Sequence, residues 1–247
     1  MTKKGAQKNP QVFIFDLDDT LYKEIDFVMS AFKHIDRLLV ADHGLKPNKA
    51  YNLLMRSYRN GDDPFEALSR LLQLNGIEIP HAADWMIEEY CYHIPAIELE
   101  PTTRFTLKSM REMKIPMYII TDGLSITQRN KIRALGLDEY IPWENVFISE
   151  DLGHDKKTPL AFMTILERYR PAADKNEYVF VGANPEKDFL VANQYGCTSI
   201  QLTDDGRNIH PQDIVVDKSR QAKMHIKYFV ELTELVDFWS FAETRKR

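Results

Sequence analysis

The chain has 247 residues, of which 44% are hydrophobic and 28% charged, a composition that suffices for one large globular domain or a core with a smaller module. Its formal net charge is -5 and its pI is about 5.8, and because no long basic block occurs, a nucleic-acid-binding surface is not indicated. The polar start MTKKGAQKNPQ has no apolar signal-peptide core, and no apolar run reaches membrane-spanning length, so the sequence predicts neither secretion nor membrane insertion.

The first part of the chain passes from one predicted strand into a long helical stretch. The apolar run QVFIFD, residues 11–16, predicts a buried strand. After it, apolar residues recur at helical spacing, and glycine and asparagine breaks divide the stretch into four helices. Asp63, Pro64 and Glu66 have the residue types of an N-cap, a first helical position and a capping box. Residues 22–98 are therefore predicted to be all-helical.

Beyond Pro101, predicted strands alternate with predicted helices. The strands are IPMYIITDG, NVFIS, YVFVG and CTSIQL, and strands separated by helices of this length form a parallel sheet with helices on both faces. The sequence therefore predicts an α/β fold, with a core at residues 1–21 and 99–247 and a four-helix insertion at 22–98.

Two further elements are predicted in the C-terminal part of the chain. Asn184 and Pro185 are typical of a helix start, and they predict the N-terminus of the helix after YVFVG. Residues 214–216, Ile-Val-Val, predict a short strand, and a helix is expected to follow as far as about residue 241.

Polar residues follow four of the predicted strands, at the carboxyl ends where open parallel sheets bind ligands. They are Asp16 and Asp18 after the first strand, Thr121, Asp122 and Gly123 after the second, Lys156 beyond the third, and Asp188 beyond the fourth. Side chains from these positions are therefore expected to meet at one edge of the sheet.

Asp16 and Asp18 carry the clearest chemical signal. Residues two apart in extended chain point to the same face, so these carboxylates are expected to converge. Two convergent carboxylates attract a hard cation such as Mg²⁺, which removes their mutual repulsion. A carboxylate can also act as a nucleophile that forms an aspartyl-phosphate, and a neighbouring carboxylate can act as acid and base. Taken alone, an Asp-x-Asp motif is equally typical of a solvated turn or a helix cap.

Four motifs occur in a fixed order along the chain: FDLDDTLY, TDG, a lysine before TP, and VGANPEKD. Together they resemble the motifs of the haloacid dehalogenase-like (HAD) hydrolase superfamily, whose members are mostly phosphatases. The resemblance covers the predicted core, at about residues 11–21 and 99–203. It implies a Rossmann-like three-layer core, and it implies that residues 22–98 are a helical C1 cap domain inserted after the first motif.

The resemblance implies a catalytic role for two aspartates and a metal site. Asp16 corresponds to the nucleophile that accepts the phosphoryl group. Asp18 corresponds to the residue that protonates the leaving group and then activates water, with its backbone carbonyl binding Mg²⁺. Asp188 corresponds to a residue that supports the metal together with Asp16 and Asp18. An alternative stays open for both residues of this motif, since Asn184 and Asp188 are also typical of the N-cap and the first-turn acid of a helix.

The resemblance also implies a phosphate site. Thr121 and the backbone of Asp122 and Gly123 correspond to groups that hold phosphate oxygens. Lys156 corresponds to the lysine that balances the charge of nucleophile and phosphate. A slip of one residue would give this role to Lys157, although the spacing of GHDKKTP favours Lys156.

The chain departs from the family pattern at its fourth motif. Family phosphatases usually read Gly-Asp-x-x-x-x-Asp after this strand, but here Ala183 stands in place of the first Asp, and Asn184 offers a neutral oxygen one position later. Losing an anionic ligand should weaken Mg²⁺ binding. Because 2-haloacid dehalogenases lack the second aspartate of the first motif, the presence of Asp18 favours phosphate chemistry.

The resulting hypothesis is an enzyme: a cytosolic, Mg²⁺-dependent phosphomonoesterase that acts on a small phosphorylated metabolite or nucleotide. Two alternatives stay open, a catalytically weakened HAD protein that binds a phosphorylated ligand and a metal-free haloacid dehalogenase. Cys91 and Cys197 lack metal-ligand spacing and are expected to be reduced packing residues. No nucleic acid or membrane is expected as a partner, and the sequence leaves the oligomeric state open.

Overall fold

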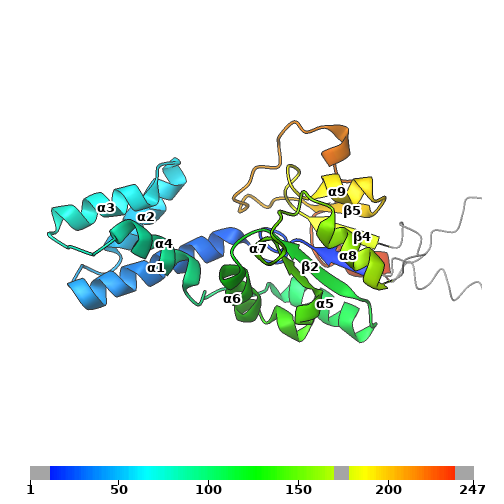
Figure 1. Cartoon of the computed structure of the whole chain (residues 1–247), viewed down its shortest axis with the longest axis horizontal. Coiled ribbons are helices and arrows are strands. Elements are labelled where there is room, and N and C mark those ends of the chain that lie inside the picture. The colour runs from blue at the N-terminus through cyan, green and yellow to red at the C-terminus, as the bar shows by residue number, and fades with distance from the viewer. Residues whose placement is uncertain (1–11, 170–177, 237–247) are drawn as a thin grey trace, which may run out of the picture. The chain divides into compact units, whose positions relative to one another are not determined.

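The computed structural model describes residues 12–169 and 178–236, and within them six strands form one parallel sheet (Figure 1). The strand order is β3-β2-β1-β4-β5-β6, so the first strand lies inside the sheet between β2 and β4. The strands are β1 (Val12–Phe15), β2 (Met117–Thr121), β3 (Val146–Ile148), β4 (Tyr178–Gly182), β5 (Thr198–Leu202) and β6 (Met224–Ile226). The predicted α/β fold with a Rossmann-like parallel sheet is confirmed.

Helices connect the strands, and five consecutive ones, α1 to α5, lie between β1 and β2 along the chain. The described residues also include three short 3-10 helices, at Leu137–Glu139, Trp143–Asn145 and Lys218–Arg220. The α-helices are α1 (Glu24–His43), α2 (Lys49–Asn60), α3 (Pro64–Leu74), α4 (Ala82–Tyr92), α5 (Pro101–Glu112), α6 (Ser125–Leu135), α7 (Ser149–Leu152), α8 (Leu160–Tyr169) and α9 (Phe189–Gln194).

The central strand is buried on both of its faces. Phe13 of β1 is in register with Met117 of β2 on one side and with Val179 of β4 on the other, and every residue of β1 is fully buried. This explains the continuous apolar run, because a parallel strand covered on both sides has no solvent-facing positions. On one face, side chains of α8 and α9 pack against the strands in a cluster that includes Ile14, Phe162 and Phe189.

The chain folds as two compact units. One contains the sheet, and the other consists of Ile25–Ile97 together with Ile126–Leu135. The predicted helical insertion therefore contributes nearly all of the second unit, but this unit also takes up most of α6, which the sequence analysis assigned to the core. That residues 22–98 act as a cap domain stays a prediction. Among the described residues, no helix combines the length and apolar character needed to cross a bilayer.

The last predicted strand is wrong in position. Residues 214–216 form no strand, and Val215 is fully exposed. The sheet is instead extended by β6, whose Ile226 is buried and pairs with Leu202 of β5. A short apolar run becomes a strand only where a neighbouring strand and a core receive it. The expected C-terminal helix is present at residues 231–236, and its continuation to residue 241 lies outside the described residues.

The helix after β4 begins later than predicted. Asn184 does not cap a helix; its Oδ1 accepts a hydrogen bond from the amide of Glu186, two residues on, in an Asx turn. The helix α9 starts only at Phe189. The predicted cap of α3 is confirmed, since Asp63 accepts hydrogen bonds from the amides of Phe65 and Glu66.

A buried histidine joins the ends of the helical unit. Nδ1 of His93 lies 2.9 Å from the carbonyl oxygen of Tyr90, so this nitrogen donates. Nε2 lies 3.2 Å from the hydroxyl of Ser30 and accepts from it when the ring is neutral. Burial lowers the pKa of His93 from 6.5 to about 4.

We expect this histidine to make the helical unit less stable in mild acid. Between about pH 6.5 and pH 4 the unfolded chain binds more protons at His93 than the folded chain does, so the free energy of unfolding falls as the pH falls through this window. His93→Gln should reduce this pH dependence. Hydrogen exchange of peptides from residues 25–97, corrected for intrinsic rates, measures it, with the exposed His43→Gln as control. Equal pH slopes in the wild type and in His93→Gln would contradict the assignment.

Candidate active site

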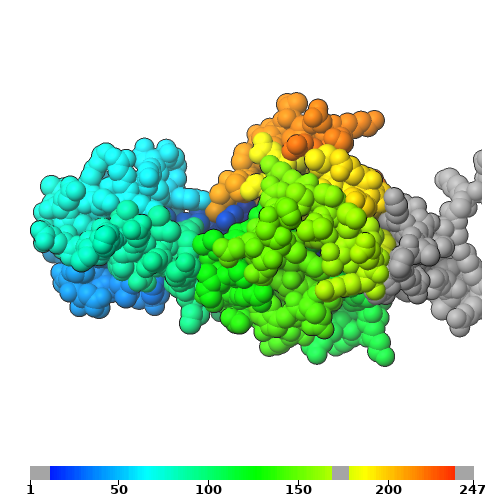
Figure 2. Space-filling model, in the orientation of Figure 1, coloured from blue at the N-terminus to red at the C-terminus, as the bar shows by residue number. Residues whose placement is uncertain are grey.

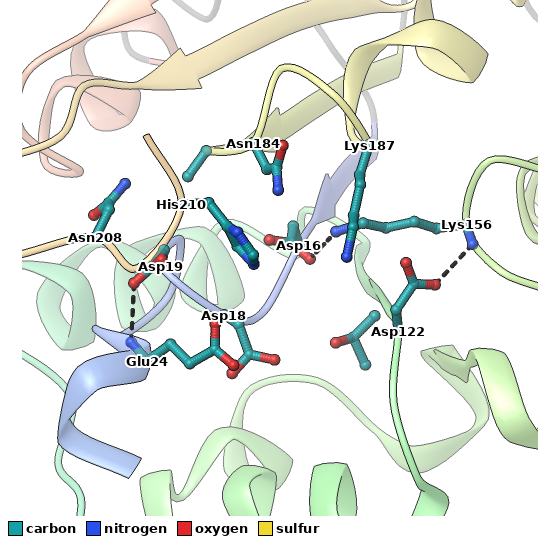
Figure 3. Close-up of a pocket in the computed structure, with 12 residues that line it drawn as sticks. Asp16, Asp18, Asp19, Glu24, Asp122, Lys156, Asn184, Lys187, Asn208 and His210 are labelled. Atoms are coloured by element: carbon teal, nitrogen blue, oxygen red, sulfur yellow. Dashed lines mark hydrogen bonds and ion pairs between the residues drawn. The ribbon is translucent and has the colours of Figure 1, made fainter. Parts of the chain in front are cut away.

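A polar pocket lies at the carboxyl edge of the sheet, within the sheet-containing unit (Figure 3). Residues that follow β1, β2, β3 and β4 meet there, as expected for an open parallel sheet. The lining residues are Asp16, Asp18, Asp19, Glu24, Thr121, Asp122, Lys156, Ala183, Asn184, Lys187, Asn208 and His210.

Asp16 is the buried centre of this pocket. It directly follows β1, and its side chain is only 4% exposed. Its Oδ1 lies 2.7 Å from Nζ of Lys156, and its Oδ2 accepts a hydrogen bond of 3.1 Å from the hydroxyl of Thr20. Burial raises the pKa of Asp16 to about 7 in spite of Lys156, and Asp188 and Asp18 contribute to the rise. The ionised form of this carboxylate would therefore be stabilised by a further positive charge.

Lys156 bridges two buried carboxylates. Its Nζ lies 2.7 Å from Asp16 and 2.6 Å from Asp188, and its amide donates to Oδ1 of Asp122. Burial alone would lower the pKa of Lys156, but the two carboxylates outweigh burial and hold this pKa well above its usual range. Lys157 is exposed and does not line the pocket. The lysine that reaches Asp16 is therefore Lys156.

Asp188 fixes the loop after β4. Its Oδ2 accepts hydrogen bonds from the amides of Ala183, at 2.9 Å, and Asn184, at 2.7 Å, while its Oδ1 pairs with Lys156. The Asp188 side chain comes so close to the backbone at position 182 that only glycine fits there, because a Cβ would lie 2.5 Å from Oδ2 of Asp188. Asp188 makes no side-chain cap on α9. Both of its oxygens are engaged by the protein, so Asp188 positions the loop and Lys156.

Asp18 lies beside Asp16 in the pocket and is held by a tyrosine. The hydroxyl of Tyr22 donates to Oδ1 of Asp18 at 2.5 Å. Burial and the nearby Asp18 carboxylate raise the pKa of Tyr22 well above its usual value, so the phenol keeps its proton. Tyr22 therefore holds the carboxylate of Asp18 in place.

The turn after β1 also holds a distant loop, residues 203–212. Asp19 accepts one hydrogen bond from the amide of Glu24, at the start of α1, and another from the amide of Ile209. Lys23 binds Asn208 at 2.7 Å and Asp205 at 3.0 Å. Figure 2 shows this loop, in orange, on the surface of the sheet-containing unit.

A glutamine ties the same loop to the end of β4. The side-chain amide of Gln212 donates to the carbonyls of Ala183 and Leu202. These contacts place Asn208 and His210 at the pocket, where Figure 3 shows the ring of His210 pointing toward Asp16 and Asn208 lying farther away, near Asp19. Neither residue was predicted from the sequence. The sequence feature that could have indicated them is the DDG turn after the fifth predicted strand, CTSIQL, because that turn lies at the same edge of the sheet.

The predicted phosphate-binding residues are only partly brought together. Thr121 ends β2, is buried and lines the pocket with Asp122. Gly123 does not line it; its amide donates to the hydroxyl of Ser149 at 2.9 Å. The φ of Gly123 is 139°, a conformation that favours glycine. Thr121 and Asp122 are thus located as expected, whereas the amide of Gly123 has a protein partner.

The donors of the pocket fit a weakly held Mg²⁺. Among the described residues no group of three or more His, Cys, Asp or Glu side chains could hold a metal, and Ala183 offers no side-chain donor. Mg²⁺ nevertheless commonly uses one or two carboxylates, substrate phosphate and water. Asp16 supplies an anionic oxygen, and Oδ1 of Asn184 has a second lone pair beyond its bond to Glu186.

Comparisons with known proteins show the family of this chain. The family model described as haloacid dehalogenase-like hydrolase matches residues 10–196. A glyceraldehyde 3-phosphate phosphatase of Methanocaldococcus jannaschii is 28% identical over 195 residues, covering 76% of this chain and 83% of the relative.

Solved structures share the fold at lower identity. The HAD-hydrolase YfnB of Bacillus subtilis, in a structure bound to magnesium, has a TM-score of 0.61 and 20% identity, covering 93% of this chain and 100% of that one. A 2-haloacid dehalogenase of Pseudomonas syringae has a TM-score of 0.58 and 24% identity, covering 93% and 99%. At these identities the two structures support the fold alone.

Proposed function

Because the chain belongs to the haloacid dehalogenase-like hydrolase family, we propose that it is a phosphatase that hydrolyses a small phosphorylated metabolite through a phosphoryl group on Asp16. The observation that carries this proposal is the buried Asp16 carboxylate, paired with Lys156 and next to Asp18, at the ligand-binding edge of the sheet. Relatives that cover most of the chain and are named glyceraldehyde 3-phosphate phosphatase support it.

In the first half of the proposed reaction, an oxygen of Asp16 attacks phosphorus and forms an acyl-phosphate while the bond to the leaving oxygen breaks. Thr20 and Lys156 hold the two oxygens of Asp16 and so orient the nucleophile. Asp18, fixed by Tyr22, donates a proton to the leaving oxygen. Lys156 offsets the negative charge of phosphate and nucleophile.

In the second half, Asp18 takes a proton from water, which attacks phosphorus and releases inorganic phosphate and free Asp16. The hydroxyl of Thr121 and the backbone amide of Asp122, two residues that line the pocket, would hold phosphate oxygens. Mg²⁺, bound by Asp16 and Asn184 with the backbone carbonyl of Asp18, would supply charge neutralisation at the phosphate. The cytoplasmic location expected from the sequence stays a prediction.

A phosphate-release assay tests the function. Phosphorylated metabolites, with p-nitrophenyl phosphate as a general substrate, are incubated with Mg²⁺ or with EDTA, and free phosphate is measured. We expect turnover of at least one metabolite that is reduced by EDTA. Release of halide from 2-haloacids together with no phosphate release would overturn the proposal in favour of a dehalogenase.

Ala183 favours a second candidate function, a weakened family member that binds a phosphorylated ligand without useful turnover. Ala183 is buried and lines the pocket at the end of β4, where it contributes no metal ligand. Ligand binding without phosphate release in the assay above would support this candidate.

Ala183→Asp should strengthen metal binding. The new carboxylate would project from the pocket wall at the carboxyl edge of the sheet, the same edge that carries Asp16. We expect the Mg²⁺ concentration for half-maximal activity to fall at least about tenfold, or ~1.4 kcal/mol, and turnover to rise. Titration calorimetry and Mg²⁺-dependent rates measure both effects, with Ala183→Asn as the uncharged control. No change in either quantity would mean that another group already supplies this ligand.

A further inference from the structure

We infer that Lys187 is a second phosphate-binding cation of this site, one that binds the substrate phosphate without help from a metal. The inference rests on the proposed phosphatase function and adds a residue to it. Lys187 lies in the fourth motif, VGANPEKD, but the family resemblance gives it no role.

The backbone places Lys187 at the pocket. It lies in the loop between β4 and α9, where its amide donates to the carbonyl of Asn184 at 3.1 Å. The next residue, Asp188, is buried and anchors the loop through the amides of Ala183 and Asn184. Figure 3 shows the Lys187 side chain extending into the pocket toward Asp16 and Lys156. Its position is thus set by the same contacts that fix Asp188.

The two lysines of the pocket differ in how their charge is balanced. Lys156 is buried and contacts two carboxylates, at 2.7 and 2.6 Å. Lys187 is half-buried, and no ion pair or hydrogen bond within residues 12–169 and 178–236 engages its ammonium. A half-buried ammonium that points into a pocket and has no partner among the described residues is suited to an anionic ligand.

The loss of a carboxylate at position 183 makes this charge more important. Ala183 precedes Lys187 in the same loop, so an aspartate there would bring a negative charge to the pocket wall. Because residue 183 is alanine, this part of the pocket wall carries the positive charge of Lys187 without an anion at position 183. A bound Mg²⁺ would also have one ligand fewer. Lys187 therefore supplies positive charge that does not depend on Mg²⁺, and phosphate should bind even when the metal is removed.

Inorganic phosphate is the probe, and Lys187→Met is compared with Lys157→Met. Lys157 is an exposed lysine close in sequence to Lys156 that does not line the pocket, so it controls for the loss of one positive charge. Dissociation constants are measured by titration calorimetry in EDTA, and KM and inhibition by phosphate are measured with Mg²⁺. Circular dichroism confirms that each variant is folded.

We expect Lys187→Met to weaken phosphate binding in EDTA about tenfold or more, as for the loss of one charge-assisted hydrogen bond, with Lys187→Arg recovering part of the loss. KM should rise by a similar factor, while Lys157→Met stays within about twofold of the wild type. Equal phosphate affinity in Lys187→Met and the wild type would overturn the inference, and so would the absence of measurable phosphate binding by the wild type in EDTA. If the wild type binds phosphate but hydrolyses no phosphate ester, the proposed function fails while the comparison of affinities still decides the role of Lys187.

Discussion

Asp16→Asn is expected to abolish phosphatase turnover and leave the fold intact. An amide cannot form the acyl-phosphate, so we expect the rate to fall at least about a thousandfold, as for other essential nucleophiles. The substitution nearly preserves shape, and Lys156 keeps its contact with Asp188. Because burial raises the pKa of Asp16 to about 7, replacing it with a neutral group removes a poorly solvated charge and should not lower stability.

Phosphate release and thermal unfolding measure the two effects. Asp138→Asn, at an exposed position of the sheet-containing unit, is the matched control and should keep both properties. If Asp16→Asn turns over substrate at a rate near that of the wild type, Asp16 is not the nucleophile. If it loses turnover only because it unfolds, the result does not support a catalytic role, and calorimetry separates the two cases.

Lys156→Met is expected to remove both turnover and stability. The substitution leaves Asp16 and Asp188 buried without their shared cation, and breaking a buried ion pair in this way costs about 3–5 kcal/mol. Activity should fall because the positive charge beside the nucleophile and the phosphate is lost. Chemical denaturation gives the stability, and phosphate release gives the activity.

A double variant separates these two consequences. Of the two carboxylates that Lys156 contacts, the double variant Lys156→Met with Asp188→Asn keeps only Asp16, and the Asn oxygen can still accept from the amides of Ala183 and Asn184. We expect it to regain part of the lost stability and none of the lost activity. A Lys156→Met variant as stable as the wild type would contradict the bridging role of Lys156.

The parts of the fold that follow from local pattern were predictable from the sequence. The buried run at β1 and the alternation of strands and helices beyond Pro101 predicted the parallel sheet. The β6 strand was missed because its place depends on pairing with β5, and an apolar run at residues 214–216 looked equally suitable. The start of α9 was misplaced because the Asn184 side chain closes a turn instead of capping a helix.

The residues of the candidate site were likewise predictable only in part. Asp16, Asp18 and Lys156 lie in motifs close to strand ends, so sequence order alone placed them at one edge. Asn208 and His210 reach the pocket through contacts between distant segments, such as Asp19 with the amide of Ile209. No local pattern encodes such contacts. The hydrogen bond from the Gly123 amide to Ser149 could not be predicted for the same reason.

The central claim is that Asp16 carries the phosphoryl group, and trapping this intermediate tests it most directly. A substrate found in the screen, labelled with ³²P in its phosphoryl group, is mixed with the protein and quenched in acid within one turnover. We predict a hydroxylamine-sensitive label on the peptide that contains Asp16, appearing before free phosphate and absent in Asp16→Asn. Complete release of phosphate with no labelled protein at any quench time, or a label that persists in Asp16→Asn, would contradict the account.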